Sequence, residues 1–501
     1  MKHHAESRRA FIKTTAAAAA GIALMPGYGF VTNRVSKPMT RSFGKLGMEV
    51  TTLGLGGQAS IQWTPADVDP VKIILKAFSK GVNYFDTSNL YGPSQGNYGK
   101  AFTELNLLPA AAGYNETLRR SIFLTTKTHL RHSKGGVNTP GVASRTNGAA
   151  GSFTVDDVKR SLSQMFGDNQ GNYPAGAYLD MVLIHNLNTM EEVDALYEGL
   201  YDTDPKAERI GALAALRDYR DGTNLTGLNP KEEKLIRHVG FSGHFSPPVM
   251  VEMIQRDQTN LLDAMLVAIN ANDKLNFNMQ HNVIPLAMAK NMGVIGMKVF
   301  ADGAMYTKEA HWTRGPEEVV RTIGDRSLPS RPLIEYTLTT PGIHTAIIGI
   351  GQISDDPAFC QLEKNLSAAQ VSPSSLNEPD RLEVEKMTRI VKEGKTNYFQ
   401  LPDNGLTPPA NVSVTPIKKG EERFVELRWN MAFAGNMPLK SYEIWRDGNL
   451  AGTVSHKPQL SKMPYIYSDK LTTGGSHEYS VVATDTAGRS AKSEAVRVGE
   501  I

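Results

Sequence analysis

The sequence predicts an α/β fold, a closed (β/α)₈ TIM barrel, followed by an all-β sandwich. Eight short β-rich segments alternate with helical patterns between residues 50 and 350, and most are apolar nearly throughout, as expected of parallel strands buried on both faces. After about residue 408, short alternating segments follow one another without helices, which is typical of a sandwich. An open doubly wound sheet is the alternative, but GLGGQAS after the first segment lacks the G-x-G-x-x-G turn of that fold.

The barrel is expected to begin after a small hairpin at residues 39–49, in which Gly44 and Gly47 supply the turn. Each strand that follows is short and rich in β-branched, aliphatic or aromatic residues. The eight predicted strands cover residues 50–57, 83–88, 121–127, 179–185, 237–243, 264–270, 293–300 and 344–350.

Helical patterns separate the strands. In one of them Thr154 is expected to be the N-cap, with Asp157 three residues later as in a capping box. In another, Ser246 precedes Pro247, and proline suits the first position of a helix. The clearest patterns cover residues 69–81, 154–166, 246–256 and 281–293, the last ending in Gly293.

Two long insertions interrupt this alternation. Residues 128–153 are rich in Gly, Ser, Thr and Asn and show no periodicity, and residues 186–236 hold a helix with extra loop. Both follow the carboxyl end of a strand, which is the face where such barrels build their active sites. Insertions of this length are usually lids or binding loops, or else disordered.

The chain changes character after the barrel domain, which is expected to span residues 37–371. Residues 372–407 combine a charged helix with a proline-containing linker, and residues 408–501 form the sandwich. Trp429 and Tyr479 fall on inward-facing positions. The order of these segments resembles a fibronectin type III domain. The predicted strands cover residues 423–430, 441–448, 464–469, 478–485 and 494–499.

Residues 1–36 are predicted to be an export signal and linker. SRRAFIK carries the pair Arg8 and Arg9, and TTAAAAAGIALM follows as a short, weakly apolar run. The segment resembles a twin-arginine signal, which implies export of the folded protein to the periplasm with any cofactor already bound. A basic amphipathic helix is the alternative, but the alanine-rich run shows no polar face.

Composition excludes several classes of protein. The formal net charge of +3 is too small and too scattered to indicate a nucleic-acid partner. Beyond the N-terminus, no apolar run of about 20 residues predicts a membrane span in the mature form. The chain has one cysteine, Cys360, so the fold cannot depend on an internal disulfide, and a core position is expected for it. No metal site is expected.

Four polar residues lie at one face of the predicted barrel. Asp86 ends the second strand, Tyr91 follows in its loop, Lys127 ends the third strand and His185 ends the fourth. Singly, each has an ordinary explanation: a capped strand end, a packed tyrosine, a solvated lysine or a structural histidine. Because adjacent strand ends converge on the barrel mouth, the four together predict a catalytic site.

This set of side chains suits carbonyl reduction. A free tyrosine has a pKa of about 10, and a close ammonium is expected to lower it. The aspartate would hold the lysine in place and keep it charged, and the histidine can donate to a carbonyl oxygen. Such a site can protonate an alkoxide or deprotonate an alcohol.

The stretches YFDTSNLYG, FLTTK, LDMVLIHNL and VGFSGH resemble, in that order, the signatures of the aldo-keto reductase family, and RSFGKLGMEVTTLGLGG resembles its opening hairpin and first strand. The resemblance covers about residues 39–370. It implies that Tyr91 is the proton donor, that Lys127 tunes it with Asp86 as salt-bridge partner, and that His185 orients the carbonyl. It also implies a hydride from NADP, or NAD, bound without a Rossmann motif.

The resemblance places cofactor contacts after the fifth to eighth strands, with departures from the family pattern. Ser242 is followed by glycine instead of asparagine, and Asn270 replaces a glutamine. Met297 and Lys298 stand where many members stack an aromatic residue, although a core position is the alternative for Met297. The residues implied to bind the cofactor are Ser242, Asn270, Met297, Lys298, Gly349, Gly351 and Asn365.

The sequence therefore predicts an exported oxidoreductase that interconverts a carbonyl and an alcohol on a small molecule, with a tightly bound nicotinamide cofactor. The signal, the polar insertions and the sandwich favour a sugar as substrate, and the sandwich favours a contact with a glycan or a protein. The rival is a non-catalytic periplasmic binding or interaction protein on the same barrel. The altered cofactor positions favour this rival, and the intact tetrad argues against it.

Overall fold

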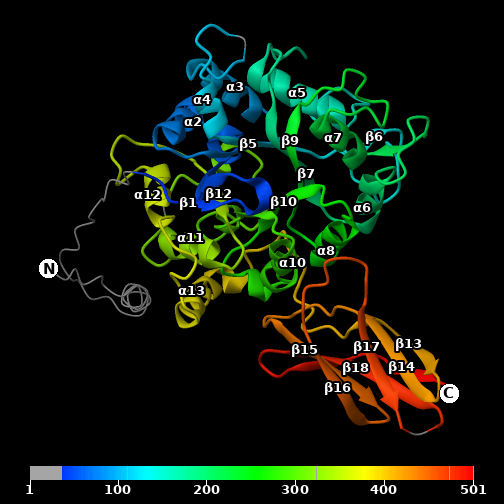
Figure 1. Ribbon diagram of the computed structural model, residues 1–501. Helices are drawn as coiled ribbons and strands as arrows, with labels where there is room; N and C mark the ends of the chain where they lie inside the picture. The colour runs from blue at the N-terminus through cyan, green and yellow to red at the C-terminus, as the bar shows by residue number, and fades with distance from the viewer. Residues whose placement is uncertain (1–36, 110, 323, 473, 500–501) are drawn as a thin grey trace, which may run out of the picture.

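The computed structural model describes residues 37–499 except residues 110, 323 and 473, so the predicted signal over residues 1–36 lies outside the described residues. Eight parallel strands close into the predicted barrel, because β12 pairs back with β3 (Figure 1). The open doubly wound alternative is therefore wrong. The barrel strands are β3 (Leu53–Gly56), β4 (Tyr84–Asp86), β5 (Phe123–Thr128), β7 (Leu179–Leu187), β9 (Ile236–Gly243), β10 (Leu262–Ala268), β11 (Gly293–Met297) and β12 (Thr345–Gly349).

The predicted hairpin lies at the amino-terminal end of the barrel. It consists of the antiparallel strands β1 (Thr40–Ser42) and β2 (Glu49–Thr51). From its turn, Phe43 is fully buried against Tyr84 and Phe123, with ring centroids 5.7 and 5.4 Å away. Gly44 has a φ of +55°, and a Cβ there would lie 2.6 Å from the backbone of Met292, so this turn requires glycine.

Helices follow the predicted pattern around the barrel. The N-terminal cap of α5 differs, because Asp156 accepts the backbone N–H of Phe153 at 2.8 Å in place of the predicted pair Thr154 and Asp157. The α-helices of the barrel are α2 (Pro70–Ser79), α3 (Ser94–Glu104), α4 (Glu116–Ser121), α5 (Thr154–Phe166), α6 (Met190–Tyr197), α7 (Ala212–Asp221), α8 (Pro247–Arg256), α9 (Met279–Asn282), α10 (Ile284–Ala289), α11 (Ser330–Thr339) and α12 (Gln361–Ala368). Short 3₁₀ turns cover Gly44–Leu46, Ala59–Ile61, Asp273–Leu275, Ala301–Gly303, Pro316–Glu318 and Val391–Gly394.

Two predicted segments differ from the structure. The single helix predicted over 281–293 is the pair α9 and α10, because Pro285 lacks the N–H that would continue the first helix. The insertion 128–153 is not wholly structureless. Its strand β6 (His132–Lys134) pairs antiparallel with β8 (Ile210–Gly211), which joins it to the second insertion.

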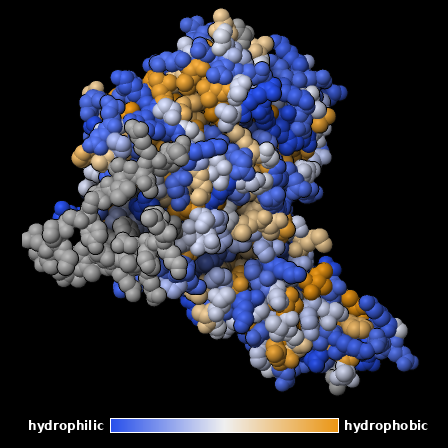
Figure 2. All heavy atoms as spheres, turned by 60° about the vertical axis from the view of Figure 1, so that its left-hand side comes forward, coloured by the Kyte–Doolittle hydropathy of each residue, from blue (hydrophilic) through white to orange (hydrophobic). Residues whose placement is uncertain are grey.

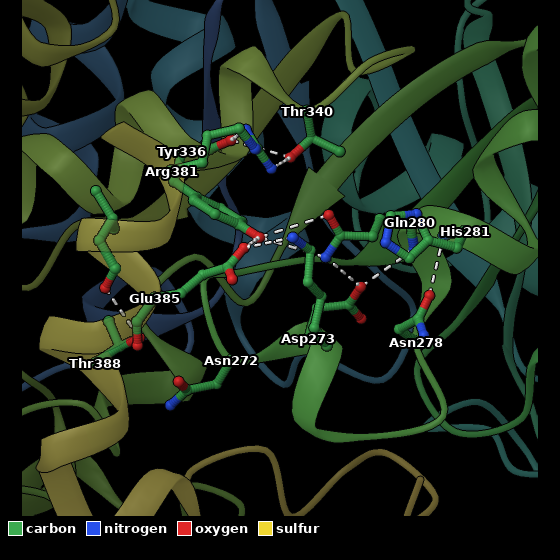
Figure 3. A network of polar contacts seen from close by, with 12 residues as sticks. Asn272, Asp273, Asn278, Gln280, His281, Tyr336, Thr340, Arg381, Glu385 and Thr388 are labelled. Atoms are coloured by element: carbon green, nitrogen blue, oxygen red, sulfur yellow. Dashed lines mark hydrogen bonds and ion pairs between the residues drawn. The ribbon is translucent and has the colours of Figure 1, made fainter. Parts of the chain in front are cut away.

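The helix after the barrel, α13 (Glu378–Ile390), packs on α11 through polar contacts. The guanidinium of Arg381 lies 3.8 Å from the ring centroid of Tyr336 and donates to the Tyr336 carbonyl at 3.0 Å. Glu385 accepts a hydrogen bond from Tyr336 Oη at 2.7 Å. Figure 3 shows this network beside Asp273, in the loop after β10. The predicted charged surface helix is thus fixed to the barrel.

The C-terminal region forms two antiparallel sheets around a shared core, β13–β14–β17 and β16–β15–β18–β19, with β20 beside β18. Trp429 and Tyr479 are fully buried between them, as predicted. Figure 2 shows this region as a narrower lobe beside the barrel. The strands are β13 (Ala410–Lys419), β14 (Glu422–Asn430), β15 (Leu439–Arg446), β16 (Asn449–Ser455), β17 (Tyr465–Leu471), β18 (His477–Asp485), β19 (Ser490–Lys492) and β20 (Val496–Val498).

Buried asparagines of the barrel hold the sandwich in place. Asn282 Nδ2 donates to the carbonyl of Ala434 at 2.9 Å, and its Oδ1 accepts the Ala434 N–H at 2.7 Å. Asn278 Nδ2 donates to the carbonyl of Gly435 at 2.7 Å. Because a buried amide without a partner is costly, these bonds favour one arrangement of the two lobes. Among the helices of the described chain, none has the length and apolar character that crossing a membrane requires.

Candidate active site

The four predicted catalytic residues meet at the carboxyl end of the barrel. β4 ends at Asp86, and Lys127 and His185 lie near the ends of β5 and β7. These three strands are neighbours, since β4 pairs with β5 and β5 with β7. Tyr91, in the loop after β4, lies over the same end, with its ring centroid 5.6 Å from that of His185.

Lys127 is the centre of the set. Its Nζ donates to Asp86 Oδ2 at 2.5 Å, to the carbonyl of Thr87 at 2.8 Å and to Tyr91 Oη at 3.5 Å. The side chains of Asp86 and Lys127 are almost completely buried. The aspartate therefore fixes the lysine, and the lysine faces the phenol, in the arrangement that the sequence predicted.

The direction of the Tyr91 pKa differs from the prediction. Burial, with the nearby carboxylates of Asp86 and Asp302, raises the pKa of Tyr91 well above its usual value. Burial also lowers the pKa of Lys127, against the attraction of Asp86. The phenol consequently keeps its proton at neutral pH, which suits a proton donor better than a base.

Ser88, which the sequence analysis missed, orients His185. Its Oγ lies 3.1 Å from His185 Nδ1 and accepts the backbone N–H of Leu90 at 3.2 Å. When the serine hydroxyl donates to Nδ1, a neutral imidazole carries its proton on Nε2. Burial first, and then the charge of Lys127, lower the pKa of His185 well below its usual value, so the neutral form prevails.

A cavity of about 150 Å³ extends from this set along the barrel mouth. Asp86 and Tyr91 of the set line it, whereas Lys127 and His185 do not, and Asn365, in α12, also belongs to the lining. Four residues predicted to bind the cofactor line the cavity: Met297, Lys298, Gly349 and Asn365. The acid–base set thus opens onto a cavity that most of the predicted cofactor-binding residues line.

The sequence profile described as the Aldo/keto reductase family matches residues 52–322, more than half of the chain. The chain belongs to this family. The family implies NAD(P)-dependent oxidoreduction of small carbonyl and alcohol substrates. No curated protein sequence matches the chain.

Solved structures of other family members are similar to this chain. One from Pseudomonas aeruginosa, assigned to the aldo-keto reductases, is 20% identical, with a TM-score of 0.42, and covers 69% of this chain and 99% of its own. An aldo/keto reductase from Klebsiella pneumoniae in complex with NADP and acetate is 15% identical, with a TM-score of 0.41, and covers 71% of this chain and 95% of its own.

Three residues predicted to bind the cofactor lie outside the lining of the reductase cavity. Ser242 Oγ accepts a backbone N–H of β7 at 2.9 Å. The amide of Asn270 is paired with that of Asn397, with both N–O distances at 3.0 Å. The N–H of Gly351 donates to Gln361 at 2.7 Å. In this structure each of these three residues bonds to another part of the protein and none of them lines the cavity.

Lys298 and Asp302 form a second charged pair on the cavity wall. Lys298 Nζ lies 3.5 Å from an Asp302 oxygen and 4.5 Å from the ring centroid of Trp312. Lys308 Nζ donates to Asp302 at 2.8 Å. Burial opposes the charge of Asp302, but the two ammonium groups lower its pKa to about 2. Asp302 was not predicted from the sequence, although it lies four residues after Lys298.

The cover segment, residues 313–322, forms part of the lining of this reductase cavity. Gln361 Nε2 donates to two of its backbone carbonyls at 3.1 and 2.8 Å. On the outside, Arg321 forms a two-point ion pair with Asp67, with N–O distances of 3.1 and 2.7 Å. The segment is therefore fastened near its C-terminal end, through its backbone to Gln361 and through Arg321 to Asp67.

Proposed function

We propose that this chain is an exported oxidoreductase that interconverts a carbonyl and an alcohol by hydride transfer with a nicotinamide cofactor, NADP or NAD. The observation that carries the proposal is the position of Lys127 between Asp86 and Tyr91 at a cavity lined also by Asn365. Such a site combines acid–base groups with a cavity for a ligand. Membership of the family supports this cofactor class.

In the reductive direction Tyr91 would donate its phenolic proton to the carbonyl oxygen. Because its pKa is raised, the phenol holds the proton until negative charge develops on that oxygen. Lys127 Nζ, 3.5 Å from the phenolic oxygen, would stabilise the phenolate that remains. His185 would donate from Nε2 to the same oxygen and orient the carbonyl. The bound cofactor would supply the hydride.

Part of the cavity lining fits an anionic dinucleotide, and the carboxylates Asp86, Asp302 and Glu318 line it as well. Lys298 supplies an ammonium, Asn365 an amide, and Gly349 a backbone without a side chain, where a Cβ would lie 2.9 Å from that of Ala59. The cavity has a volume of about 150 Å³ and the cover segment lines part of it, so we propose that an outward movement of this segment admits the cofactor. Closure would then retain it.

Retention of the cofactor in the cavity would suit the export that the sequence of residues 1–36 suggests. A twin-arginine signal would carry the folded protein to the periplasm, where free nicotinamide cofactor is scarce, and successive substrates would recycle the bound one. Protein purified from the periplasm should contain nicotinamide in about equal molar amount, by absorbance and mass spectrometry. Periplasmic protein without it contradicts retention.

We infer a sugar as the substrate class. Phe245 and Trp312 are 38% and 45% exposed, directly next in sequence to the cavity-lining residues His244 and Thr313. Exposed aromatic rings beside polar groups suit a ligand with apolar faces and hydroxyl edges. The fibronectin-like sandwich would add a contact with a glycan or a protein.

The function is tested with reduced and oxidised NADP and NAD against a panel of aldehydes, ketones and oxidised sugars. The proposal predicts turnover by the wild type and its loss in Tyr91→Phe with cofactor binding kept. Binding of small molecules without any turnover would favour the rival, a non-catalytic binding protein.

A further inference from the structure

The strap, residues 396–401, links the barrel to the sandwich and crosses the barrel mouth. Leu401 N–H donates to the carbonyl of Phe245 after β9 at 3.1 Å, and its own carbonyl accepts the N–H of Phe277 at 2.9 Å. Asn272 Nδ2, after β10, donates to Thr396 Oγ1 at 2.9 Å. The strap is therefore part of the barrel's carboxyl end.

Asn397 holds the backbone of Lys298. Its amide forms two hydrogen bonds with the amide of Asn270, both at 3.0 Å, and Asn270 Nδ2 also donates to the Lys298 carbonyl at 2.9 Å. Lys298 has a φ of +61°, a left-handed conformation that costs a lysine free energy unless the surroundings fix it. Asn397 supplies part of that constraint through Asn270.

Tyr398 holds the other end of the same lysine. Its Oη donates to Asp302 Oδ2 at 3.0 Å, and Asp302 Oδ1 lies 3.5 Å from Lys298 Nζ. Phe399, which is 3% exposed, packs against the ring of Trp312, whose centroid lies 4.5 Å from Lys298 Nζ. The strap thus reaches both the main chain and the ammonium of a cavity-lining residue.

We propose that Asn397 and Tyr398 are positioning residues that hold Lys298 on the cavity wall, where it contacts the nicotinamide dinucleotide. This inference rests on the proposed function for its ligand. Neither strap residue lines the cavity, so both act through Asn270 or Asp302. The position of the strap and the affinity of the protein for its cofactor are then coupled.

The test measures the dissociation constant of NADPH by fluorescence titration of the full chain. Tyr398→Phe keeps the ring packing but removes one hydrogen bond to a carboxylate, and it should weaken binding about tenfold. Asn397→Ala should weaken NADPH binding by a similar factor, because it removes the contact that acts through Asn270 on the Lys298 backbone. Tyr467→Phe removes a hydrogen bond to the Ala451 carbonyl inside the sandwich and should leave affinity unchanged.

The decisive arm is Tyr398→Phe in a Lys298→Met background. If the strap acts through Lys298, adding Tyr398→Phe to Lys298→Met should change NADPH affinity less than about twofold, because the Lys298 contact that Tyr398 supports is already lost. A full tenfold effect there, or unchanged affinity in both single strap variants, overturns the inference. A wild type that binds neither NADPH nor NADH overturns the proposed function itself.

Discussion

Replacing Lys127 by Met removes one charge from the centre of the tetrad and keeps the volume of the side chain. The ammonium lies 2.5 Å from Asp86 Oδ2 and 3.5 Å from Tyr91 Oη. Asp86, whose pKa burial already raises, takes up a proton once its partner is gone. The main loss is then the attraction between the ammonium and the phenolate that forms as Tyr91 gives up its proton.

The size of that loss follows from the distance. For unit charges 3.5 Å apart, Coulomb's law at an effective dielectric constant of about 20 gives about 4.7 kcal/mol, which sets the upper limit. If about half of the charge has developed in the transition state, the loss is about 2.4 kcal/mol. The expected decrease in kcat therefore lies between roughly 50-fold and 3,000-fold.

Single-turnover absorbance of the reduced nicotinamide measures this step without interference from product release. Lys45→Met is the matched control, since its ammonium contacts the Asn260 carbonyl and Asp263 at the opposite end of the barrel. Cofactor affinity should stay within about threefold in both variants, because Lys127 does not line the cavity. A Lys127→Met enzyme with a hydride-transfer rate within threefold of the wild type refutes the reasoning.

Three further predictions concern other parts of the site. Ser88→Ala should lower kcat about tenfold and shift the ¹⁵N signals of His185 toward the tautomer with its proton on Nδ1. Ser88→Thr should restore both kcat and the ¹⁵N signals. Unchanged ¹⁵N signals in Ser88→Ala would contradict this role of Ser88. Burial, opposed by hydrogen bonds, raises the pKa of Asp157 from its usual value of 3.8 to about 6. Its contribution of about 3 kcal/mol to stability is therefore present at low pH and is lost as pH rises through 6. The wild-type Tm should therefore fall relative to that of Asp157→Asn between pH 4 and pH 7, and parallel curves would show that Asp157 does not titrate there. Arg321→Ala, which opens the ion pair to Asp67, should speed cofactor dissociation a few-fold without changing the chemical step, and an unchanged dissociation rate would mean that this pair does not fasten the cover segment.

The barrel was predictable because each strand is an apolar run with turn residues at its ends. The tetrad followed from the same pattern, since residues at adjacent strand ends must meet. The prediction of a single helix over 281–293 was wrong because the apolar spacing continues across Pro285, although the missing N–H of this proline divides the segment into two helices. The direction of the Tyr91 pKa could not be predicted, because it depends on burial and on Asp302, which lies more than 200 residues away in the sequence.

The residues predicted to bind the cofactor show a second limit of prediction from the sequence. Asn270 occupies the expected place after the sixth strand, yet its amide is paired with Asn397 in the strap. Asn397 lies 127 residues away, in a segment with no periodic pattern, so no local sequence pattern indicates that the two amides pair. The same holds for Tyr398, whose phenol meets Asp302 only in the folded chain.

The central claim is that Tyr91 gives its proton to a carbonyl oxygen beside a bound nicotinamide. Hydride transfer by Tyr91→Phe, measured in a single turnover with the cofactor bound, tests it most directly. The account predicts cofactor affinity within about threefold of the wild type and a hydride-transfer rate lower by at least about 100-fold. A Tyr91→Phe protein that transfers hydride at the wild-type rate would contradict it.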